Sequence, residues 1–217
     1  MAAEDRLIPE VPEPEGRRRL ILLLFVGWLI AVSVGIYAVW RYSSQPGEAS
    51  RSLTHWPVES KLALSKEKLT LLMFLHPKCP CSRTSVNELA ILLGRRRSDF
   101  ETTVVFIHPS GVPDEWSKTG LRDKVAALPG VQIFEDREGR EGKRFQAATS
   151  GETFLFNPAG ELLFHGGITL ARGHAGNNEG RRFLTACKEA SPEGAPRHTS
   201  VFGCPLEGLC SEIPSAP

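Results

Sequence analysis

Residues 69–90 read LTLLMFLHPKCPCSRTSVNELA, and this stretch decides the fold that we expect. Its first seven residues form a continuous apolar run of strand length, which is typical of a strand buried on both faces of a sheet. Val86, Leu89 and Leu93 then follow at a helical spacing, and Gly94 is a plausible residue to end the helix. The sequence therefore predicts a strand, a turn that contains two cysteines, and a helix.

Cys79 and Cys81 lie in the predicted turn, next to the start of the helix. The first backbone N–H groups of a helix have no partner within it, and together with the helix dipole they favour a thiolate over a thiol. Lys78 and Arg83 add positive charge on either side. The pattern therefore favours reactive thiols over structural ones. A disulfide between Cys79 and Cys81 would close a small strained ring, so it would be easily reduced.

Residues 20–40 (LILLLFVGWLIAVSVGIYAVW) form an apolar run whose only ionisable group is the phenol of Tyr37. An apolar helix of about 20 residues crosses the hydrocarbon layer of a bilayer. The apolar core of a signal peptide is shorter, roughly 7–15 residues, and Trp40 and Tyr42 suit the membrane interface. The run therefore predicts an uncleaved transmembrane helix over residues 20–40.

The charges beside this run predict its orientation. Arg17, Arg18 and Arg19 precede it, whereas only Arg41 follows directly. Such a basic cluster stays in the cytoplasm, so we expect residues 42–217 outside, in the periplasm, with the protein in a bacterial inner membrane. Disulfides persist in that compartment, which matters for a chain with five cysteines.

Composition divides the rest of the chain. Residues 1–19 are rich in proline and glutamate and predict a disordered cytoplasmic tail, and residues 41–55 have the small polar composition of a linker. Residues 56–190 fit one domain, and residues 191–217 form a cysteine-containing C-terminal extension. The net charge is +1, and the basic clusters lack interleaved aromatic residues, so nucleic acid is not an expected partner.

Strand and helix patterns alternate after the cysteine turn. We expect strands over residues 102–108, 131–134, 151–156 and 161–165, and helices over residues 114–128, 141–148 and about 178–190. Asp114 and either Asn177 or Asn178 are candidate N-caps. The order βαβα followed by ββα predicts an α/β fold with helices on both faces of one sheet.

These residues carry a resemblance to a known family. The stretch 69–90, the hairpin TFLFNPAGELLFHGG and the final amphipathic helix resemble the membrane-anchored members of the thioredoxin-like superfamily, and among them the bacterial RedB-type proteins. The resemblance covers residues 69–190. It implies a thioredoxin-like sheet flanked by helices, and a thiol–disulfide oxidoreductase whose partner is a thiol or disulfide of a periplasmic protein or small molecule.

The resemblance also implies residue roles. Glu88 and Leu89 lie nine and ten residues after Cys79, the spacing that follows the first cysteine of a thioredoxin-type motif. Cys79 is thus expected to attack, Ser82 occupies the place of the usual resolving cysteine, and Cys81 is an additional thiol that resolves or shares the bond. Gly151 and Glu152 occupy the loop that faces the motif, where the superfamily usually has a cis-proline.

The other cysteines have different expected roles. Cys187 lies on the apolar face of the last predicted helix, where a cysteine is usually a small buried hydrophobic residue. Cys204 and Cys210 lie in the extension, and they form either a structural disulfide or a redox relay that folds back over the motif. The sequence leaves both alternatives open.

The histidines provide a second hypothesis. Soft thiolates combined with imidazole select copper or zinc, so Cys79, Cys81 and His76 are an alternative copper site of a metallochaperone. Otherwise His76 packs on the turn, no metal or cofactor is expected, and the domain is an oxidoreductase or a non-catalytic binding module. Residues 165–178 are predicted to be a loop in which Arg172 and His174 receive an anion, or else a simple connection capped by Asn177 or Asn178.

Overall fold

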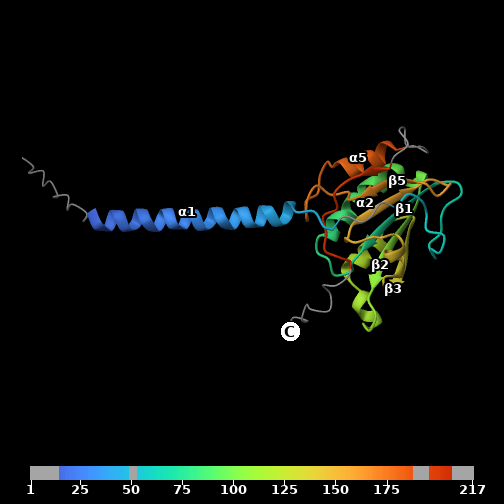
Figure 1. Cartoon of the computed structure of the whole chain (residues 1–217), viewed down its shortest axis with the longest axis horizontal. Helices are drawn as coiled ribbons and strands as arrows, with labels where there is room; N and C mark the ends of the chain where they lie inside the picture. Colours follow the sequence, from blue (N-terminus) through green and yellow to red (C-terminus); the bar gives the residue numbers. More distant parts are fainter. Residues whose placement is uncertain (1–14, 49–52, 188–195, 207–217) are drawn as a thin grey trace, which may run out of the picture. The chain divides into compact units, whose positions relative to one another are not determined.

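The computed structural model describes residues 15–48, 53–187 and 196–206, and the chain divides into two compact units, residues 1–42 and 43–217 (Figure 1). In the first unit, helix α1 begins at Glu15 and continues to Ser44. Its residues 16–44 form a helix long and apolar enough to cross a membrane by length and composition, and an 18-residue window of it has a mean hydropathy of 2.5. Residues 15–19, predicted to be disordered, are helical because they continue the apolar helix, and residues 1–14 lie outside the described part.

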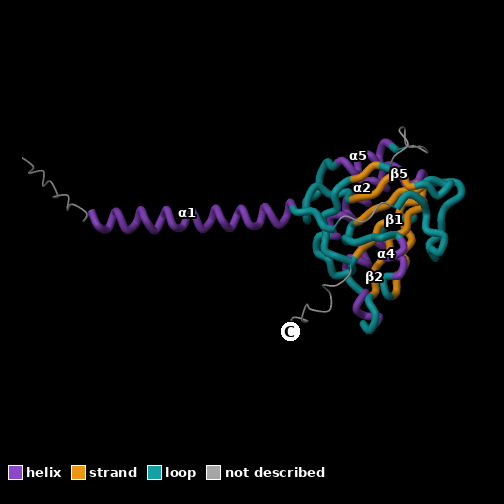
Figure 2. Tube along the Cα trace, viewed as in Figure 1, coloured by secondary structure: helices purple, strands orange, loops and turns teal. Residues whose placement is uncertain are grey.

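One mixed sheet with the strand order β3-β2-β1-β4-β5-β6 forms the second unit. The strands are β1 (Leu69–Leu75), β2 (Phe100–His108), β3 (Val131–Arg137), β4 (Glu152–Phe156), β5 (Leu162–Gly166) and β6 (Arg197–His198). The first three strands are parallel, β4 is antiparallel to both β1 and β5, and β6 is parallel to β5. Strand β1 is therefore in the interior of the sheet, and Figure 2 shows the strands side by side with helices around them.

Every residue of β1 is buried because the sheet is covered on both faces. Leu71, Met73 and Leu75 belong to one apolar cluster, and Leu72 and Phe74 belong to another. Alternate side chains of a strand point to opposite faces, so a strand between two clusters must be apolar throughout. The continuous run of residues 69–75 is thus explained by its central place.

Helices pack on both faces, as the sequence predicts. Helices α2 (Ser82–Arg96), α3 (Gly120–Ala126) and α5 (Glu179–Ala186) contribute to the cluster around Leu71, and α4 (Arg140–Arg144) leads into Phe145 of the other cluster. Two short 3-10 helices, η1 (Arg97–Asp99) and η2 (Asp114–Ser117), complete the elements. The predicted α/β sheet flanked by helices, preceded by one long apolar helix, is confirmed.

The second predicted helix is wrong in its extent. Residues 114–128 form η2 and α3 instead of one helix, and Asp114 does not cap through its side chain. Lys118, between the two helices, has a ψ of 88°, outside the helical range. The ring of Trp116 contacts His76 at a centroid distance of 5.2 Å, and Thr119 donates a hydrogen bond to the carbonyl of Pro77. Contacts with the cysteine turn therefore override the helical pattern here.

Three other helix ends also differ from the sequence pattern. Helix α2 runs through Gly94 to Arg96, whose guanidinium donates hydrogen bonds to the carbonyls at the end of α5 and so holds the last turn. Helix α4 ends early, and Gln146 just beyond it has a φ of 56°, which is incompatible with a right-handed helix. Helix α5 begins after Asn178, which caps it as expected, but it ends at Ala186.

Residues 43–48, which composition assigns to a linker, make specific contacts within the second unit. The N–H of Gly47 donates to the carbonyl of Val201 at 2.8 Å, and the carbonyl of Glu48 accepts from the hydroxyl of Thr149 at 3.2 Å. The carbonyl of Ser43 accepts from the N–H of Arg172. Residues 43–48 therefore lie on the domain, next to the C-terminal segment.

Candidate redox site

The cysteine turn connects the end of β1 to the start of α2. The N–H of Cys79 donates to the carbonyl of His76 at 3.1 Å, and the N–H of Ser82 donates to the carbonyl of Cys79 at 3.2 Å. Cys81 is the N-cap residue of α2, with helical backbone angles and no capping bond from its side chain. Cys79 is 2% exposed and Ser82 is fully buried, whereas Cys81 is partly exposed. The turn thus holds Cys79 beneath the surface at the helix start.

A second segment, residues 199–206, brings a third sulfur to this turn. The N–H of Leu206 donates to the carbonyl of Ala148, and the N–H of Ser150 donates to the carbonyl of Cys204, both at 2.8 Å. The sulfur atoms of Cys79, Cys81 and Cys204 all lie within 4.8 Å of one another. The predicted fold-back of the extension over the motif is thus seen for Cys204, whereas Cys210 lies outside the described residues.

The environment of Cys79 stabilises its thiolate. A hydrogen bond from the Cys204 thiol is the largest influence on the pKa of Cys79, and it opposes the effect of burial. The Ser82 hydroxyl and the backbone N–H groups of Cys204 and Ser82 also donate, and together these bonds lower the pKa of Cys79 to about 4. Cys79 is therefore ionised at neutral pH, and much of that effect comes from the C-terminal segment.

The other two thiols of the site remain protonated. The pKa of Cys204 is raised, first because its thiol donates to Cys79 and then because of burial. Burial also raises the pKa of Cys81, as does the negative charge of Cys79. Arg172 lowers the pKa of both, and its guanidinium donates to the carbonyl of Gly203. The site thus combines one thiolate with two thiols beside a fixed cation.

Gly151 lies opposite the turn, in the position that the resemblance assigns to a proline. Its φ is 97°, and its N–H donates to the carbonyl of Phe74 at 2.8 Å. A Cβ atom there would lie 2.8 Å from the hydroxyl oxygen of Ser85, so both the backbone angle and the contact favour glycine. None of the described peptide bonds is cis.

Ser150 is a site residue that the sequence analysis missed. Its hydroxyl oxygen lies 2.7 Å from that of Ser82 and accepts a hydrogen bond from the N–H of His76 at 2.8 Å. Because its own N–H donates to Cys204, Ser150 connects the turn to the C-terminal segment. A serine before a glycine has no distinctive pattern in the sequence, so only the fold reveals this role.

Glu152 does not face the cysteines. It is fully buried in β4, and its carboxylate accepts from the N–H of Ala148 at 2.7 Å and lies 2.5 Å from Nε2 of His165. Side chains two residues apart share a face, and Phe154 belongs to the cluster opposite α2. Glu152 therefore supports the loop from behind, beside a cavity of about 410 Å³ that His198 also lines.

The histidines do not join the three sulfurs. His76 is buried, burial lowers its pKa, and its Nδ1 accepts a hydrogen bond from the N–H of Lys78 at 3.2 Å. Among the described residues, the thiol group that could hold a metal contains Cys204 in place of His76. Three sulfur donors suit a soft ion such as Cu(I).

In the loop of residues 165–178, His174 is exposed, and its Nδ1 lies 2.9 Å from the carbonyl oxygen of Arg172.

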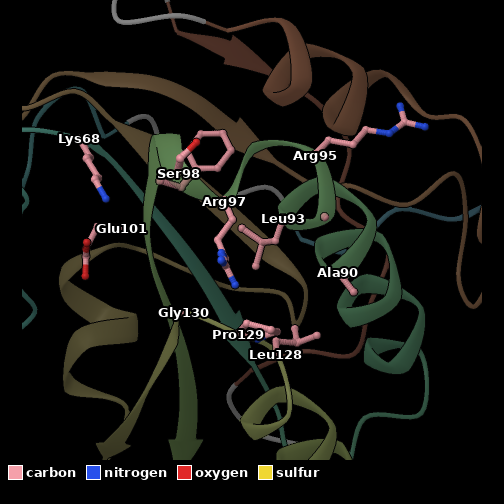
Figure 3. Close-up of a pocket in the computed structure, with 12 residues that line it drawn as sticks. Lys68, Ala90, Leu93, Arg95, Arg97, Ser98, Glu101, Leu128, Pro129 and Gly130 are labelled. Atoms are coloured by element: carbon pink, nitrogen blue, oxygen red, sulfur yellow. The ribbon is translucent and has the colours of Figure 1, made fainter.

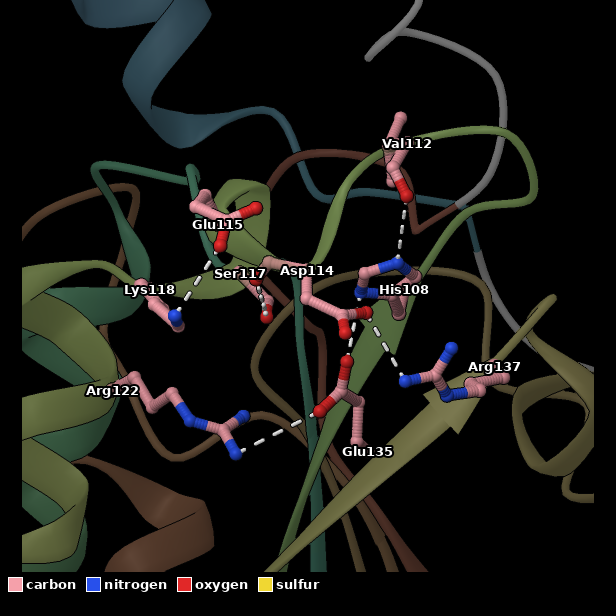
Figure 4. A network of polar contacts seen from close by, with 9 residues as sticks. All are labelled: His108, Val112, Asp114, Glu115, Ser117, Lys118, Arg122, Glu135 and Arg137. Carbon is pink, nitrogen blue, oxygen red and sulfur yellow. Dashed lines mark hydrogen bonds and ion pairs between the residues drawn. The ribbon is translucent and has the colours of Figure 1, made fainter.

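A second polar group lies at the end of β2 (Figure 4). Nδ1 of His108 lies 2.8 Å from Oε1 of Glu135, and the carboxylate of Asp114 is close enough to complete a possible metal site. However, Arg137 and Arg122 pair with Asp114 and Glu135 respectively. With two arginines balancing the two carboxylates, this network is best explained as a structural connection between β2, β3 and η2.

A cavity of about 710 Å³ lies away from the cysteines. It lies between the C-terminal end of α2, the start of β2 and the turn before β3, with Lys68, Arg97 and Glu101 around it (Figure 3). This cavity lies at the N-terminal end of β1, whereas Cys79 follows the C-terminal end of that strand. Cys187 follows the last residue of α5. It is buried in the core cluster, as the sequence predicts for a small hydrophobic residue.

Two solved structures resemble most of this chain, whereas comparisons of the sequence find no match. No protein-family profile matches the sequence, and no curated protein matches it. The structure is similar to an uncharacterised conserved protein from Geobacillus kaustophilus, with 16% identity over 79% of this chain and 94% of the other, at a TM-score of 0.52. A hypothetical protein from Sinorhizobium meliloti is similar with 20% identity over 76% and 94% of the two chains, at a TM-score of 0.50.

A secreted disulfide oxidoreductase from Mycobacterium tuberculosis is also similar, with 13% identity over 57% of this chain and 81% of the other. Its TM-score of 0.41 is too low to bear on the activity of this chain. The sheet order, the strand, turn and helix of residues 69–96, and the hairpin β4–β5 nevertheless agree with one architecture. The globular part of this chain has a thioredoxin-like fold.

Proposed function

We propose that this protein is a membrane-tethered thiol–disulfide oxidoreductase in which Cys79 is the attacking thiolate. The observation that carries the proposal is the set of donors around the Cys79 sulfur: the thiol of Cys204, the hydroxyl of Ser82 and two backbone N–H groups. A thiolate is the nucleophile in disulfide exchange, and donors of this kind stabilise it. By contrast, burial raises the pKa of Cys187, the cysteine of the core cluster.

The tether and the compartment are part of the same proposal. Helix α1 supplies an apolar segment of the length that a bilayer requires, and Arg17, Arg18 and Arg19 lie at its N-terminal end. This arrangement supports a cytoplasmic N-terminus and a domain in the bacterial periplasm, as in the RedB-type proteins that the sequence resembles. A phosphatase reporter fused after Pro217 is expected to be active. An inactive phosphatase, with an active cytoplasmic reporter at the same place, would contradict the orientation.

The chemical test measures exchange in the full-length chain in detergent. The reduced protein is mixed with the chromogenic disulfide 5,5′-dithiobis(2-nitrobenzoate) at pH 5.5, where ordinary thiols react slowly because they are protonated. We expect fast release of the chromogenic thiolate in the wild type and in Cys187→Ala, with one equivalent from attack by Cys79 and a second when another thiol resolves the mixed disulfide, and no fast release in Cys79→Ser. Equal fast phases in the wild type and in Cys79→Ser would overturn the assignment of Cys79.

Copper binding by a carrier is the alternative proposal, and the cluster of three sulfurs within 4.8 Å is the observation that favours it. Cys79, Cys81 and Cys204 would hold the ion, and bound copper would take part in delivery to another protein. The test is metal analysis of the reduced full-length chain after equilibration with Cu(I) and a competing chelator. Stoichiometric copper that is lost in Cys204→Ser and retained in His76→Ala, without disulfide exchange, would support the carrier over the enzyme.

A further inference from the structure

The thiol–disulfide activity needs a second thiol to release the partner from Cys79, and the turn itself provides a poor one. Ser82 occupies the place three residues after Cys79 and has no sulfur. Cys81 is only two residues away, so a bond between them would close a small strained ring. Among the described residues, the thiol of Cys204 is free of this constraint: it is distant in sequence, and the structure places it beside Cys79.

Backbone contacts fix Cys204 in that position. Its carbonyl accepts from the N–H of Ser150, and an isolated bridge pairs Thr149 with Pro205 on its C-terminal side. Gly203 approaches Ser150 so closely that a Cβ atom would overlap the carbonyl oxygen of Ser150. This segment therefore adopts one defined path beside the turn, and glycine at position 203 permits it.

From this geometry we infer that Cys204 is the resolving cysteine and that the redox disulfide of this protein joins Cys79 to Cys204. The inference rests on the proposed function and adds the identity of the second redox residue. It also replaces the predicted Cys204–Cys210 relay with a direct bond between the C-terminal segment and the motif.

The reaction balances with a partner disulfide as the oxidant. The Cys79 thiolate attacks one sulfur of the partner, forms a mixed disulfide and releases the partner's first thiolate, which takes up a proton. Cys204 then loses its proton to solvent and attacks the sulfur of Cys79. The Cys79–Cys204 bond forms, and the second partner thiolate leaves and is protonated. Two cysteines are oxidised and one partner disulfide is reduced to two thiols.

The environment of Cys204 suits this order of events. While Cys79 is a thiolate, the Cys204 thiol is held as its hydrogen-bond donor. In the mixed disulfide Cys79 carries no charge, so the largest influence that raises the pKa of Cys204 is removed, while burial still raises that pKa and Arg172 lowers it. The reaction of Cys79 thus lowers the pKa of Cys204 and makes it a better nucleophile for the second step.

Trapping of the mixed disulfide tests the inference. The reduced full-length chain is treated with glutathione disulfide at pH 7, quenched with acid and analysed by mass spectrometry. We expect the wild type and Cys81→Ser to lose the glutathione adduct quickly, whereas in Cys204→Ser the adduct on Cys79 should persist at least tenfold longer. The serine keeps a hydroxyl donor beside Cys79, so the first step is preserved.

Peptide mapping identifies the bond directly. Tryptic cleavage after Lys78, Arg83 and Arg197 leaves Cys79 and Cys81 on one short peptide and Cys204 and Cys210 on the C-terminal peptide. Oxidised protein should yield these two peptides joined, and the joined pair should survive in a variant that carries both Cys81→Ser and Cys210→Ser. A Cys79–Cys81 or Cys204–Cys210 bond as the main product would overturn the inference.

The outcomes also separate this inference from the proposed function. If no adduct forms on Cys79 in any variant, the oxidoreductase proposal itself fails. If the adduct forms and persists in Cys81→Ser or Cys210→Ser but not in Cys204→Ser, the oxidoreductase proposal holds, and Cys204 is not the resolving residue.

Gly203→Ala provides an independent variant that keeps every cysteine. The added methyl group should displace residue 204 from Ser150 and slow resolution about tenfold, while the first reaction at Cys79 continues. Gly94→Ala is the matched control because nothing lies within 4 Å of the place that its methyl group would take and the residue is within helix α2. Equal resolution rates in the two variants would contradict the positioning role of the close contact at Gly203.

Discussion

Two regions supply the thiols of one site, and they are held in very different ways. Cys79 and Cys81 follow a strand whose seven residues are all buried, and they precede a helix of 15 residues. Cys204 lies in an irregular segment that a few backbone hydrogen bonds and the close contact at Gly203 hold in place. The first region is fixed by the core, and the second is held by contacts that can open locally without unfolding the sheet. Because Cys79 is only 2% exposed, a partner larger than a small disulfide requires such an opening.

The largest expected effect tests this difference in stability. Phe74→Ala removes a fully buried ring of β1 and should lower the free energy of unfolding by about 3–5 kcal/mol. Leu206→Ala also removes a buried side chain, but near the end of the C-terminal segment, so its loss should appear mainly as local opening. Denaturant unfolding measures the first effect, and hydrogen exchange at Ser150 measures the second. Equal global losses in the two variants would show that the segment is part of the cooperative core.

The difference between the two regions also explains what the sequence predicts. Residues 69–96 have local patterns that determine their structure: an apolar run and then a helical spacing of apolar residues. The bounds of strand β1 and the buried face of helix α2 are therefore predicted correctly. The thioredoxin-like sheet follows from that order of elements. Helix ends fail where tertiary contacts decide them, as with Trp116 on His76 and Arg96 on the carbonyls of α5.

For the site, the sequence indicates the residues of the cysteine turn but not the contacts that other segments make with it. Cys79 and Cys81 are candidates because they lie at a predicted helix start, Ser82 is a candidate through the family resemblance, and Cys204 is a candidate because it lies in the cysteine-containing extension. The role of Ser150 and the direction of the Glu152 side chain depend on how loop 148–151 packs between β1 and the C-terminal segment. No periodicity or composition encodes that packing, since it joins segments that are far apart in the sequence.

The second prediction concerns the donor that the C-terminal segment provides. Because the Cys204 thiol is the largest cause of the low pKa of Cys79, Cys204→Ala should raise that pKa from about 4. A hydrogen bond to a charged group contributes about 1.5–3 kcal/mol, which corresponds to roughly one to two pH units. The pH dependence of iodoacetamide alkylation at Cys79 measures the shift. Cys204→Ser, which keeps a donor, should shift the midpoint less, and an unchanged midpoint in Cys204→Ala would show that the tail does not stabilise the thiolate.

The third prediction concerns the pH dependence of the reduction potential. Between about pH 5 and 8 the reduced pair holds Cys79 as a thiolate and Cys204 as a thiol, because the pKa of the first is lowered and that of the second is raised. Reduction of the disulfide then takes up two electrons and one proton, so the potential should fall by about 30 mV per pH unit. Two ordinary thiols would take up two protons and give about 59 mV per unit. Equilibration with glutathione buffers measures the slope, and the steeper value would contradict the mixed ionisation state.

The smallest expected effect compares the local donor with the distant one. Ser82 also donates to the Cys79 sulfur, but its side-chain bond has a smaller influence on the pKa than that of Cys204. Ser82→Ala removes this donor and leaves the hydroxyl of Ser150, whose oxygen lies 2.7 Å from that of Ser82, with one partner fewer. We therefore expect the alkylation midpoint of Cys79 to rise by less than about one pH unit, and the protein to lose about 1 kcal/mol of stability. The matched pair Ser82→Ala and Cys204→Ala, measured under the same conditions, decides the ranking. If Ser82→Ala gives the larger shift, the cysteine turn activates its own thiolate and the C-terminal segment contributes only the second sulfur.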